Sequence, residues 1–534
     1  MRTFTYNLVV GTIIFLRVSS PLSSPSLAQD WEVQRAQGTI KVVDLFDSTV
    51  SAMLNYVEGL VTTDRDNNLI PCLATNWRWL DGKTIEFKLR RGVRFHNGDE
   101  FNAEAVRVNW DHYKKMKNPR VLTLTNLPDE TEFKIIDDYT VRFTLPQPDG
   151  LVFVKFAWFF QAAPAFFKQH KVIEKNWLYL TEPGPWGTGP FKLVEGGGAY
   201  SKPSDRIVLE AYEDYWDPRY PKISRVVFDN TLRAKRKEAM RLCSEKEGVV
   251  DIVSHIRPLD TLKVAESPFA KVVKSRDVTR LGAFINQRKV NSKWRDIRLR
   301  RALNYAINRE ELLKYASIGN AYNLGGFIPP GAYGYDAGLR VYEYDTLKAK
   351  ALVEEAGYPN GFDVKMIVLE PFKLEAQIIS RMLKRIGLNV SLHIFSFPEW
   401  AQKIYIPALD KPPEEQDWDI AIWRWPDQFG HVGATFLTSG FTEESDGRWI
   451  QYDPLFEKGW QDMAGTLNTA VQEEKVRKLA KYIYDNAYSL FIYSPISLYA
   501  VNKEIDFVPQ KLMFLRFKET SVTENHWSRR GQNN

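Results

Sequence analysis

The chain has 534 residues, a length that predicts about three domains rather than one core. Its composition, 44% hydrophobic and 13% aromatic, is that of a globular protein and excludes a disordered chain. The formal net charge falls from +6 to +4 when the two arginines of the leader predicted below are removed. So small an excess argues against binding to nucleic acid or to another polyanion.

The first 28 residues have the features of a secretory signal peptide. Arg2 precedes a short apolar run from Tyr6 to Leu16, and Ser26-Leu27-Ala28 provides small residues at a cleavage point. The run is too short to span a bilayer. No cysteine follows the cleavage point, and no later window approaches 18 uninterrupted apolar residues. We therefore expect a cleaved leader over 1–28 and a soluble periplasmic protein, with an amphipathic N-terminal anchor as the alternative.

The stretch from Thr84 to Val106 is predicted to form a hairpin that leads into a helix. Apolar and charged residues alternate over 85–90, and the apolar pattern resumes over Val93–Phe95. Asn97-Gly98 is a strong turn signal because both residues tolerate positive φ. Asn102 is a favourable N-cap for the helix, whose apolar residues follow at helical spacing.

Most of the later chain alternates strands and helices. Residues 207–253 read as strands with one helix through Met240, and 363–397 read as strand, helix and strand with Gly387 ending the helix. This βαβ pattern predicts parallel pairing with a right-handed crossover. Further helices are predicted after the caps Asp296, Asn308 and Asp345. A strand is predicted over 418–425, and a last long helix over 470–486 precedes a strand over 490–493.

Two cysteines and two basic clusters allow alternative interpretations. Cys72 and Cys243 either form a disulfide in an oxidising compartment or remain buried thiols, and the sequence favours neither alternative. The clusters over 233–237 and 298–301 lie on predicted helices with apolar residues between the charges, so we interpret them as solvated helix faces.

The sequence contains no standard catalytic or metal-binding motif. The seven histidines lack the zinc-protease spacing, two cysteines cannot build a thiolate metal site, and no G-x-S-x-G is present. Asp64, Asp66 and Asn68 have calcium-loop spacing, but Leu69 and Thr75 stand where that loop needs glycine and glutamate. We therefore expect no enzyme, no cofactor and no metal site. A secreted hydrolase with an unrecognised carboxylate site is the rival of another class.

Several blocks, in order along nearly the whole mature chain, resemble the family 5 extracellular solute-binding proteins. These proteins are the peptide, nickel and opine receptors of ABC importers, and they include the dipeptide- and oligopeptide-binding proteins. The blocks are LIPCLATNWRWLDGKTIEFKLRRGVRFHNGDEFNAEAV (69–106), WGTGPFKLVE (186–195), LEAYEDYWDPRYPKISRVVF (209–228), DIRLRRALNYAINREELL (296–313), YDTLKAKALVEEAGYPNGF (344–362) and DWDIAIWRW (417–425).

The resemblance implies an α/β fold of the periplasmic binding protein-like type II, with two hinged lobes and an additional domain, as in the large peptide-receptor class. By similarity, a discontinuous first lobe combines 29–68, 187–281 and 500–534. The additional domain covers 69–186, and the second lobe covers 282–499. A ligand between the lobes contacts both only in the closed form, so binding shifts the population toward closure.

The resemblance also implies a recognition segment over 423–436, which reads WRWPDQFGHVGATF. In the peptide receptors, an aspartate a few residues after a tryptophan pairs with the α-ammonium of the cargo. Trp425 matches the tryptophan, and Asp427 is the nearest carboxylate. The spacing is one residue shorter than in the oligopeptide receptors, and the Asp/Glu-Pro that follows there is absent. The alternative for Asp427 is a turn residue after Pro426.

Three further residues of this segment are candidates for ligand binding. His431 lies near a histidine that helps to hold a metal chelate in the nickel-binding branch, and its alternative is a surface or structural residue. Trp423 and Trp425 point to the same side of the predicted strand, where they stack on cargo or pack under the lobe. Arg424 faces either a cargo carboxylate or solvent.

The implied function is a periplasmic receptor that captures a small peptide and delivers it to an ABC importer. Its partners are the peptide and the permease subunits in the inner membrane, with the ATPases as indirect partners. It is expected to act as a monomer. The alternative within the same class is another small solute, namely a nickel chelate, an opine or a sugar-derived compound.

Overall fold

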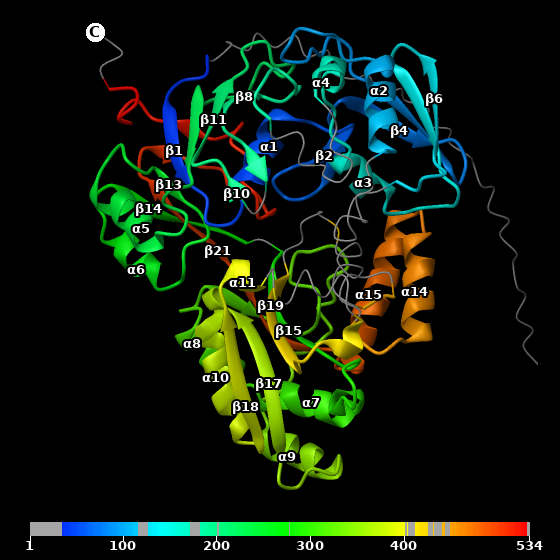
Figure 1. The fold of residues 1–534 in the computed structure, drawn as a ribbon, viewed down its shortest axis with the longest axis vertical. Helices are drawn as coiled ribbons and strands as arrows, with labels where there is room; N and C mark the ends of the chain where they lie inside the picture. The colour runs from blue at the N-terminus through cyan, green and yellow to red at the C-terminus, as the bar shows by residue number, and fades with distance from the viewer. Residues whose placement is uncertain are drawn as a thin grey trace, which may run out of the picture.

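In a computed structural model of the chain, three larger sheets organise the described residues. These residues are 35–115, 127–170, 182–199, 202–276, 278–400, 403, 412–425, 431, 441–443 and 449–530. The seven-stranded and four-stranded sheets lie in the upper half of Figure 1, and the six-stranded sheet lies below them. The leader predicted over 1–28 lies outside the described residues. Within the described part of the chain, no helix combines the length and the apolar character needed to cross a membrane.

The seven-stranded sheet is the centre of what we call the first lobe. In spatial order its strands are β14 (Ala270–Ser275), β21 (Ser497–Asn502), β13 (Ile252–Val253), β1 (Thr39–Val43), β12 (Arg225–Asp229), β11 (Arg206–Ala211) and β8 (Phe191–Glu195). Strand β1 is central and runs parallel to both of its neighbours. Because side chains alternate along a strand, Ile40 and Val42 pack on the side of α1 (Ser48–Tyr56). Val43 packs on the side of α5 (Arg236–Glu245) and α6 (Asp260–Ala265).

The four-stranded sheet is antiparallel and shares its core with the first lobe. Its strands in spatial order are β4 (Ala74–Trp79), β5 (Thr84–Leu89), β7 (Thr140–Thr144) and β6 (Glu132–Asp137). Its helices are α2 (Ala103–Tyr113), α3 (Val152–Trp158) and α4 (Pro164–Gln169). We call this part the four-stranded unit. One continuous cluster of buried apolar side chains extends from Ile40 of β1 to Phe87 of β5 and Phe143 of β7.

The predicted hairpin and helix are partly confirmed. The Asn102 side chain caps α2 by accepting a hydrogen bond from the Ala105 N–H at 3.1 Å. The second strand, predicted over Val93–Phe95, is wrong. Only a single bridge between Arg94 and Glu100 forms there, because turns on both sides leave too few residues for a strand. Strand β5 instead pairs with β4 and β7.

The six-stranded sheet is the centre of the second lobe. In spatial order its strands are β16 (Ala321–Asn323), β20 (Ser489–Pro495), β15 (Arg280–Ile285), β19 (Ile420–Trp425), β17 (Phe362–Leu369) and β18 (Leu388–Phe395). Its helices are α7 (Ile297–Ala306), α8 (Arg309–Tyr315), α9 (Thr346–Glu355), α10 (Lys373–Lys384), α11 (Phe397–Trp400), α14 (Pro454–Ala464) and α15 (Thr469–Asp485). The βαβ prediction is confirmed, since β17 and β18 are parallel and joined by α10. Asp296, Asn308 and Asp345 cap α7, α8 and α9 as predicted.

Short elements complete the described chain. The small strand pairs are β2 (Val61–Thr63) with β3 (Leu69–Pro71), β9 (Gly198–Ala199) with β10 (Lys202–Pro203), and β22 (Ile505–Asp506) with β23 (Ser521–Val522). The 3-10 turns are η3 (Lys293–Arg295), η4 (Glu370–Phe372) and η6 (Pro413–Glu415). The short strand β13 occupies only the end of the apolar run at 249–253.

Two sequence interpretations are decided by burial. Cys72 and Cys243 are both buried and form no disulfide, which selects the thiol alternative. In the cluster over 298–301, Arg298 and Arg301 are exposed as predicted, but Arg300 is only 4% exposed. Its guanidinium donates to the carbonyls of Trp294 at 2.7 Å and Asn486 at 3.1 Å. The solvated interpretation is therefore wrong for Arg300, which satisfies carbonyls from distant parts of the chain.

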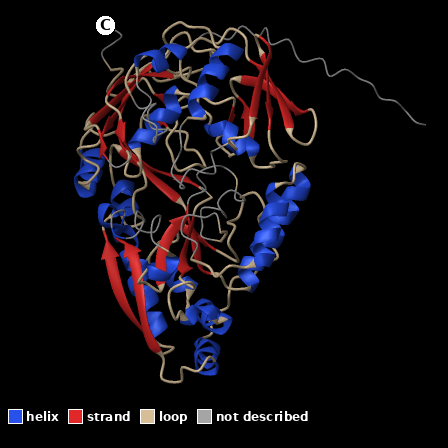
Figure 2. Cartoon of the chain, turned by 45° about the vertical axis from the view of Figure 1, so that its right-hand side comes forward, coloured by secondary structure: helices blue, strands red, loops and turns tan. Residues whose placement is uncertain are grey.

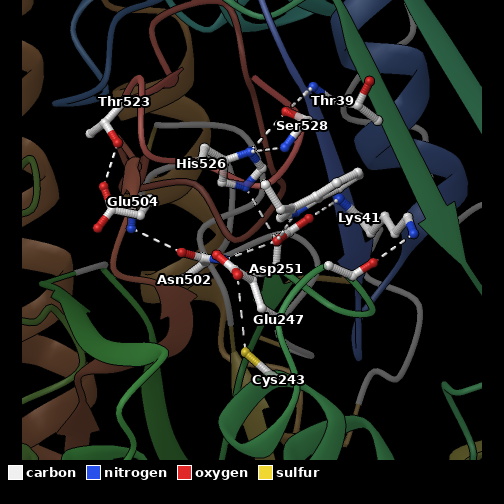
Figure 3. Close-up of polar contacts among 12 residues, drawn as sticks. Thr39, Lys41, Cys243, Glu247, Asp251, Asn502, Glu504, Thr523, His526 and Ser528 are labelled. Carbon is white, nitrogen blue, oxygen red and sulfur yellow. Dashed lines mark hydrogen bonds and ion pairs between the residues drawn. The ribbon is translucent and has the colours of Figure 1, made fainter. Parts of the chain in front are cut away.

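A buried carboxylate fixes the C-terminal tail to the first lobe (Figure 3). Asp251 is 0% exposed, and its Oδ2 accepts from the Lys41 N–H at 2.9 Å. Its Oδ1 accepts from Asn502 Nδ2 at 3.2 Å and from Trp527 Nε1 at 2.8 Å, and lies 3.3 Å from His526 Nε2. One carboxylate thus joins β1, β21 and the tail, and it compensates its own burial with several hydrogen bonds.

Two neighbouring segments connect the lobes. One leads from β14 to β15, and the other leads from β20 to β21 through Ile496. They run side by side, because β14 pairs with β21 on one side of the crossing and β15 pairs with β20 on the other. The Ser494 hydroxyl donates to the Thr279 carbonyl at 2.6 Å within the crossing. In Figures 1 and 2 the second lobe lies below the first, and this crossing connects the two.

Candidate ligand-binding site

The recognition segment predicted from the sequence begins at the edge of the second lobe that faces the first. Strands β17, β18 and β19 are parallel and end together at this edge, where β15 begins. In open α/β sheets, ligands bind outside the carboxyl ends of the strands. The edge points toward the first lobe in Figure 1, so strand topology brings the end of β19 between the two sheets.

Trp423 packs against another tryptophan of its own lobe. Along β19, Ile420 and Ile422 enter the core on the side of α7 and α10, whereas Ala421 and Trp423 face the opposite side of the sheet. There the Trp423 ring stacks on Trp400, with centroids 5.0 Å apart and an angle of 23° between the planes. Trp423 is half-buried, so part of its surface remains accessible.

Arg424 connects the recognition strand to the crossing segments. Its side chain is half-buried, and Nη2 lies 3.4 Å from Oγ of Ser497, the first residue of β21. Beside it, the Tyr493 hydroxyl donates to Glu375 Oε1 at 2.6 Å. Burial raises the pKa of Glu375 and raises the pKa of Tyr493 well above its ordinary value, while the positive charge of Arg424 opposes the shift at Tyr493.

Of the other predicted site residues, Trp425 and His431 lie within the described part of the chain and Asp427 does not. Trp425 is the last residue of β19, and its backbone lies opposite Arg280 of β15. Asp427 lies outside the described residues. His431 is held by α15, where its Nε2 lies 3.1 Å from Gln472 Oε1, and its ring centroid is 4.6 Å from that of Tyr333.

The environment of His431 fixes its charge and its tautomer. Burial lowers the pKa of His431 to about 4, so the ring is neutral at pH 7. Because an amide oxygen only accepts hydrogen bonds, Nε2 carries the proton in its contact with Gln472. Nε2 is therefore not available to a metal in this arrangement. Within the described residues, no three His, Cys, Asp or Glu side chains gather in a way that suits a metal ion.

Sequence reasoning missed a guanidinium at the same edge. Arg280 begins β15, is 1% exposed, and lies with its guanidinium carbon 3.9 Å from the centre of the Phe327 ring. The available signal was a single charge in the strand RLGAFI, which is otherwise apolar or glycine. Long charged residues are rarely so deeply buried without a specific role.

The facing edge of the first lobe carries two buried carboxylates, which sequence reasoning also missed. Asp44 follows β1 and accepts from the hydroxyls of Ser51 at 2.7 Å and Ser254 at 2.6 Å. Asp47 caps α1 by accepting from the N–H groups of Thr49 at 3.0 Å and Val50 at 3.1 Å. Burial raises the pKa of Asp47 to about 7. The available signal was an aspartate directly after an apolar strand and a second aspartate followed by Ser48 and Thr49.

Charges on the two lobes lie close enough to influence each other. Glu370 follows β17 in the second lobe, and its negative charge acts on the guanidinium groups of Arg236 and Arg257 in the first. Burial, the larger effect, lowers the pKa of Arg236, whereas the hydrogen bond to Asp260 raises that of Arg257. Besides the crossing, the two lobes therefore interact electrostatically.

Comparison with known proteins agrees with this architecture. Residues 68–446 match the family described as bacterial extracellular solute-binding proteins, family 5 Middle. The chain is 26% identical over 471 residues to the dipeptide-binding protein of Escherichia coli K12, covering 82% of this chain and 83% of that protein. It is 29% identical over 477 residues to the glutathione-binding protein GsiB of Salmonella choleraesuis, covering 86% of this chain and 87% of that protein.

A solved structure shows the same fold. The periplasmic binding protein DppA of Helicobacter pylori, in complex with the peptide STSA, superposes with a TM-score of 0.74 at 20% identity, covering 92% of this chain and 99% of that one. The predicted two-lobed α/β fold of the periplasmic binding protein type is thereby confirmed. Since the family match covers most of the sequence, the chain belongs to the family 5 bacterial extracellular solute-binding proteins, which are receptors and not enzymes.

Proposed function

We propose that this receptor captures a small peptide between its lobes and delivers it intact to the permease of an ABC importer. The observation that carries the proposal is the similarity, over more than four fifths of the chain, to proteins named for binding dipeptide and glutathione. Glutathione is itself a small peptide, so both names refer to one chemical class. The nickel-chelate alternative is not favoured by His431, whose Nε2 is directed to Gln472.

The proposed mechanism is closure about the crossing segments. A peptide that contacts the ends of β17 and β19 together with the polar residues after β1 makes its full set of contacts only when the lobes approach. Closure excludes water and so strengthens each polar contact with the cargo. No bond of the peptide is made or broken, and opening releases it unchanged.

The proposed recognition groups follow the chemistry of a peptide. A free peptide carries an ammonium at one end and a carboxylate at the other. We assign the ammonium to Asp427 and the carboxylate to a guanidinium at the same edge, with Arg424 as the candidate, because such pairs are strong when desolvated. Trp425 is proposed to contact the peptide, whereas Trp423 and His431 are proposed to support the site from their contacts with Trp400 and Gln472.

The remaining assignments stay proposals of the same kind. We propose the division into a first lobe (29–68, 187–281 and 500–534), an additional domain (69–186) and a second lobe (282–499). We further propose that residues 1–28 are removed on export to the periplasm. The mature protein would act there as a monomer that docks on the permease in its closed form.

Mass spectrometry of the purified receptor tests the proposed cargo. The protein is isolated without denaturant, washed and then denatured, and the released small molecules are identified. We expect short peptides in an intact state. Release of a metal chelate, an opine or a sugar derivative, with no peptide bound in calorimetric titration, would reject the peptide assignment while leaving the receptor class in place.

Replacement of Asp427 tests amine recognition. We expect Asp427→Ala to weaken binding of the co-purified peptide by about 2–5 kcal/mol, because a buried ammonium loses its partner. Asp417→Ala is a suitable control, since Asp417 is close in sequence but exposed and paired with Lys365 at 2.7 Å. A loss below about 0.5 kcal/mol for Asp427→Ala in isothermal titration would reject the role.

A further inference from the structure

Helix α3 lies between two hydrophobic cores. Its sequence, VFVKFAW, is apolar on nearly every side, a pattern typical of a helix that is buried all round. Val152 and Phe156 face the core shared by the first lobe and the four-stranded unit. Leu151, just before the helix, and Val154 face a different core, which is built mainly from residues of the second lobe. The four-stranded unit therefore contacts the second lobe directly.

The one charged residue of α3 holds the preceding loop in place. Lys155 Nζ lies 2.6 Å from Asp149 Oδ2, and both side chains are largely buried. The other oxygen of Asp149 accepts from the Leu151 N–H at 2.8 Å, which closes a tight turn around Gly150. This loop is therefore fixed within the four-stranded unit before it meets the second lobe.

Gly150 brings the backbone of the four-stranded unit very close to the second lobe. Its N–H donates to the carbonyl of Ala464, the last residue of α14, at 2.6 Å. A Cβ atom at this position would lie 2.0 Å from the Thr466 carbonyl oxygen and 2.3 Å from Gln472 Nε2. Because the nearer obstacle is backbone, any side chain would force the two surfaces apart. The contact between residue 150 and the second lobe therefore requires glycine, because there is no space for a side chain.

The surface that receives Gly150 belongs to the second lobe and reaches the recognition segment. Phe456 of α14 and Ile483 of α15 share a core with Phe491 of β20, so both helices are packed on the second lobe. Gln472 of α15 donates to the Thr466 carbonyl at 3.0 Å, and its Oε1 lies 3.1 Å from His431 Nε2. A single side chain thus contacts both the docking surface and a residue of the proposed site.

We propose that residues 148–154 form a latch that docks on the α14–α15 hairpin when the lobes close and helps to hold the receptor shut around its cargo. Separation of the lobes breaks the Gly150–Ala464 hydrogen bond and exposes Leu151 and Val154 to water. The latch lies away from the crossing segments, so it adds a second point of attachment that exists only in the closed form. The nature of the cargo rests on the proposed function, but the docking contact does not.

The matched pair Gly150→Ala and Gly82→Ala tests the latch. Gly82 belongs to the same four-stranded unit, and a Cβ built there meets no described atom within 4 Å. Hydrogen exchange of the Gly150 and Leu151 amides, small-angle scattering, and titration with alanyl-phenylalanine and with glutathione are measured for the wild type and both variants. Leu151→Ala, which removes apolar contact without a clash, serves as a second variant.

The expected result is a protected residue-150 amide in the wild type and in Gly82→Ala. In Gly150→Ala we expect loss of this protection, a larger radius of gyration and at least tenfold weaker binding of whichever probe the wild type binds. Leu151→Ala should weaken binding by a smaller factor. Identical exchange and scattering for Gly150→Ala and Gly82→Ala, or an unprotected Gly150 amide in the wild type with and without probe, overturns the latch. If the wild type binds neither probe but the exchange differs as expected, these two peptides are excluded as cargo and the latch stands.

Discussion

The two junctions of this molecule differ in how they are built. The four-stranded unit joins the first lobe through a continuous core, in which buried residues of β1, β5 and β7 belong to one cluster. The second lobe joins the first through two crossing segments and a few charges near Glu370, and it contacts the four-stranded unit through the outer face of α3 with its loop. One junction is a domain interior, and the other resembles a contact between separate proteins.

This difference indicates which junction moves. Opening the first junction would expose many fully buried aromatic and aliphatic side chains, each stabilised by about 1.5–3 kcal/mol through burial. Opening the second would expose Leu151 and Val154 and break few hydrogen bonds. A free-energy difference of a few kcal/mol is one that a bound peptide can reverse. We therefore expect the four-stranded unit to move with the first lobe during closure.

The largest expected effect concerns the interior of the first lobe. Asp251→Ala leaves Lys41 N–H, Asn502 Nδ2 and Trp527 Nε1 without their acceptor in a buried site. We expect the free energy of unfolding to fall by about 3–5 kcal/mol, because several buried donors lose their shared acceptor. Urea denaturation measures the change.

A control variant and a hydrogen-exchange measurement of each lobe make this test specific. Asp229→Ala removes a carboxylate whose hydrogen bonds, among the described residues, go to neighbouring Thr231, so its effect should stay within about 0.5 kcal/mol. In hydrogen exchange, Asp251→Ala should loosen the seven-stranded sheet and the four-stranded unit together while leaving β17 and β18 protected. Equal loosening of both lobes would contradict the comparison of junctions.

A smaller effect depends on pH at the first lobe's edge. Burial raises the pKa of Asp47 from 3.8 to about 7, so the folded state binds a proton that the unfolded state has already released above pH 4. Stability should therefore decrease as pH rises from about 4 to about 7 and then level off. Asp47→Asn keeps the helix cap but cannot ionise. We expect the variant to gain about 2–4 kcal/mol relative to the wild type between pH 4 and pH 8.

Urea denaturation at several pH values gives both curves for this comparison. The other buried carboxyl groups, including Glu58 and Glu375, are common to the two proteins, so the difference between the curves isolates Asp47. Parallel curves for wild type and Asp47→Asn would show that Asp47 is ionised in the folded protein. In that case the first lobe would present a negative charge toward the second at neutral pH.

Sequence reasoning succeeded where the deciding contacts are local. The caps Asn102, Asp296, Asn308 and Asp345 bond to backbone groups within three residues, so the chain nearby contains all the information. The strand expected over Val93–Phe95 failed because strand formation depends on distant partners, and β5 found them in β4 and β7. The burial of Arg300 was missed for the same reason, since its acceptor Asn486 lies 186 residues away.

The candidate site was predictable only in part. The recognition segment over 423–436 was predicted from resemblance to a family, and its ligand contacts stay a prediction. Arg280 and Asp47 were missed because their importance comes from two sheet edges that meet only in the folded chain. Gly150 is the extreme case, because one glycine gives no pattern, and its role depends on backbone atoms of Thr466 far along the sequence. Spatial proximity of distant segments is the property that local patterns cannot encode.

The smallest expected effect tests whether Trp423 stabilises the edge of the second lobe or contacts the peptide directly. Trp423 is half-buried and stacks on Trp400, so Trp423→Ala should lower the stability of the second lobe by about 1–2 kcal/mol. Affinity for the co-purified peptide should change by less than about threefold, because the Trp423 ring is proposed to support the site and not to contact the peptide. A direct contact that contributes about 1.4 kcal/mol to binding would already give a tenfold change. Trp423→Phe, which keeps an aromatic contact with Trp400, should recover most of the stability. Unchanged stability with a tenfold loss of affinity would instead place the ring against the cargo, and the second lobe's edge would then bind through its aromatic face as well as through its charges.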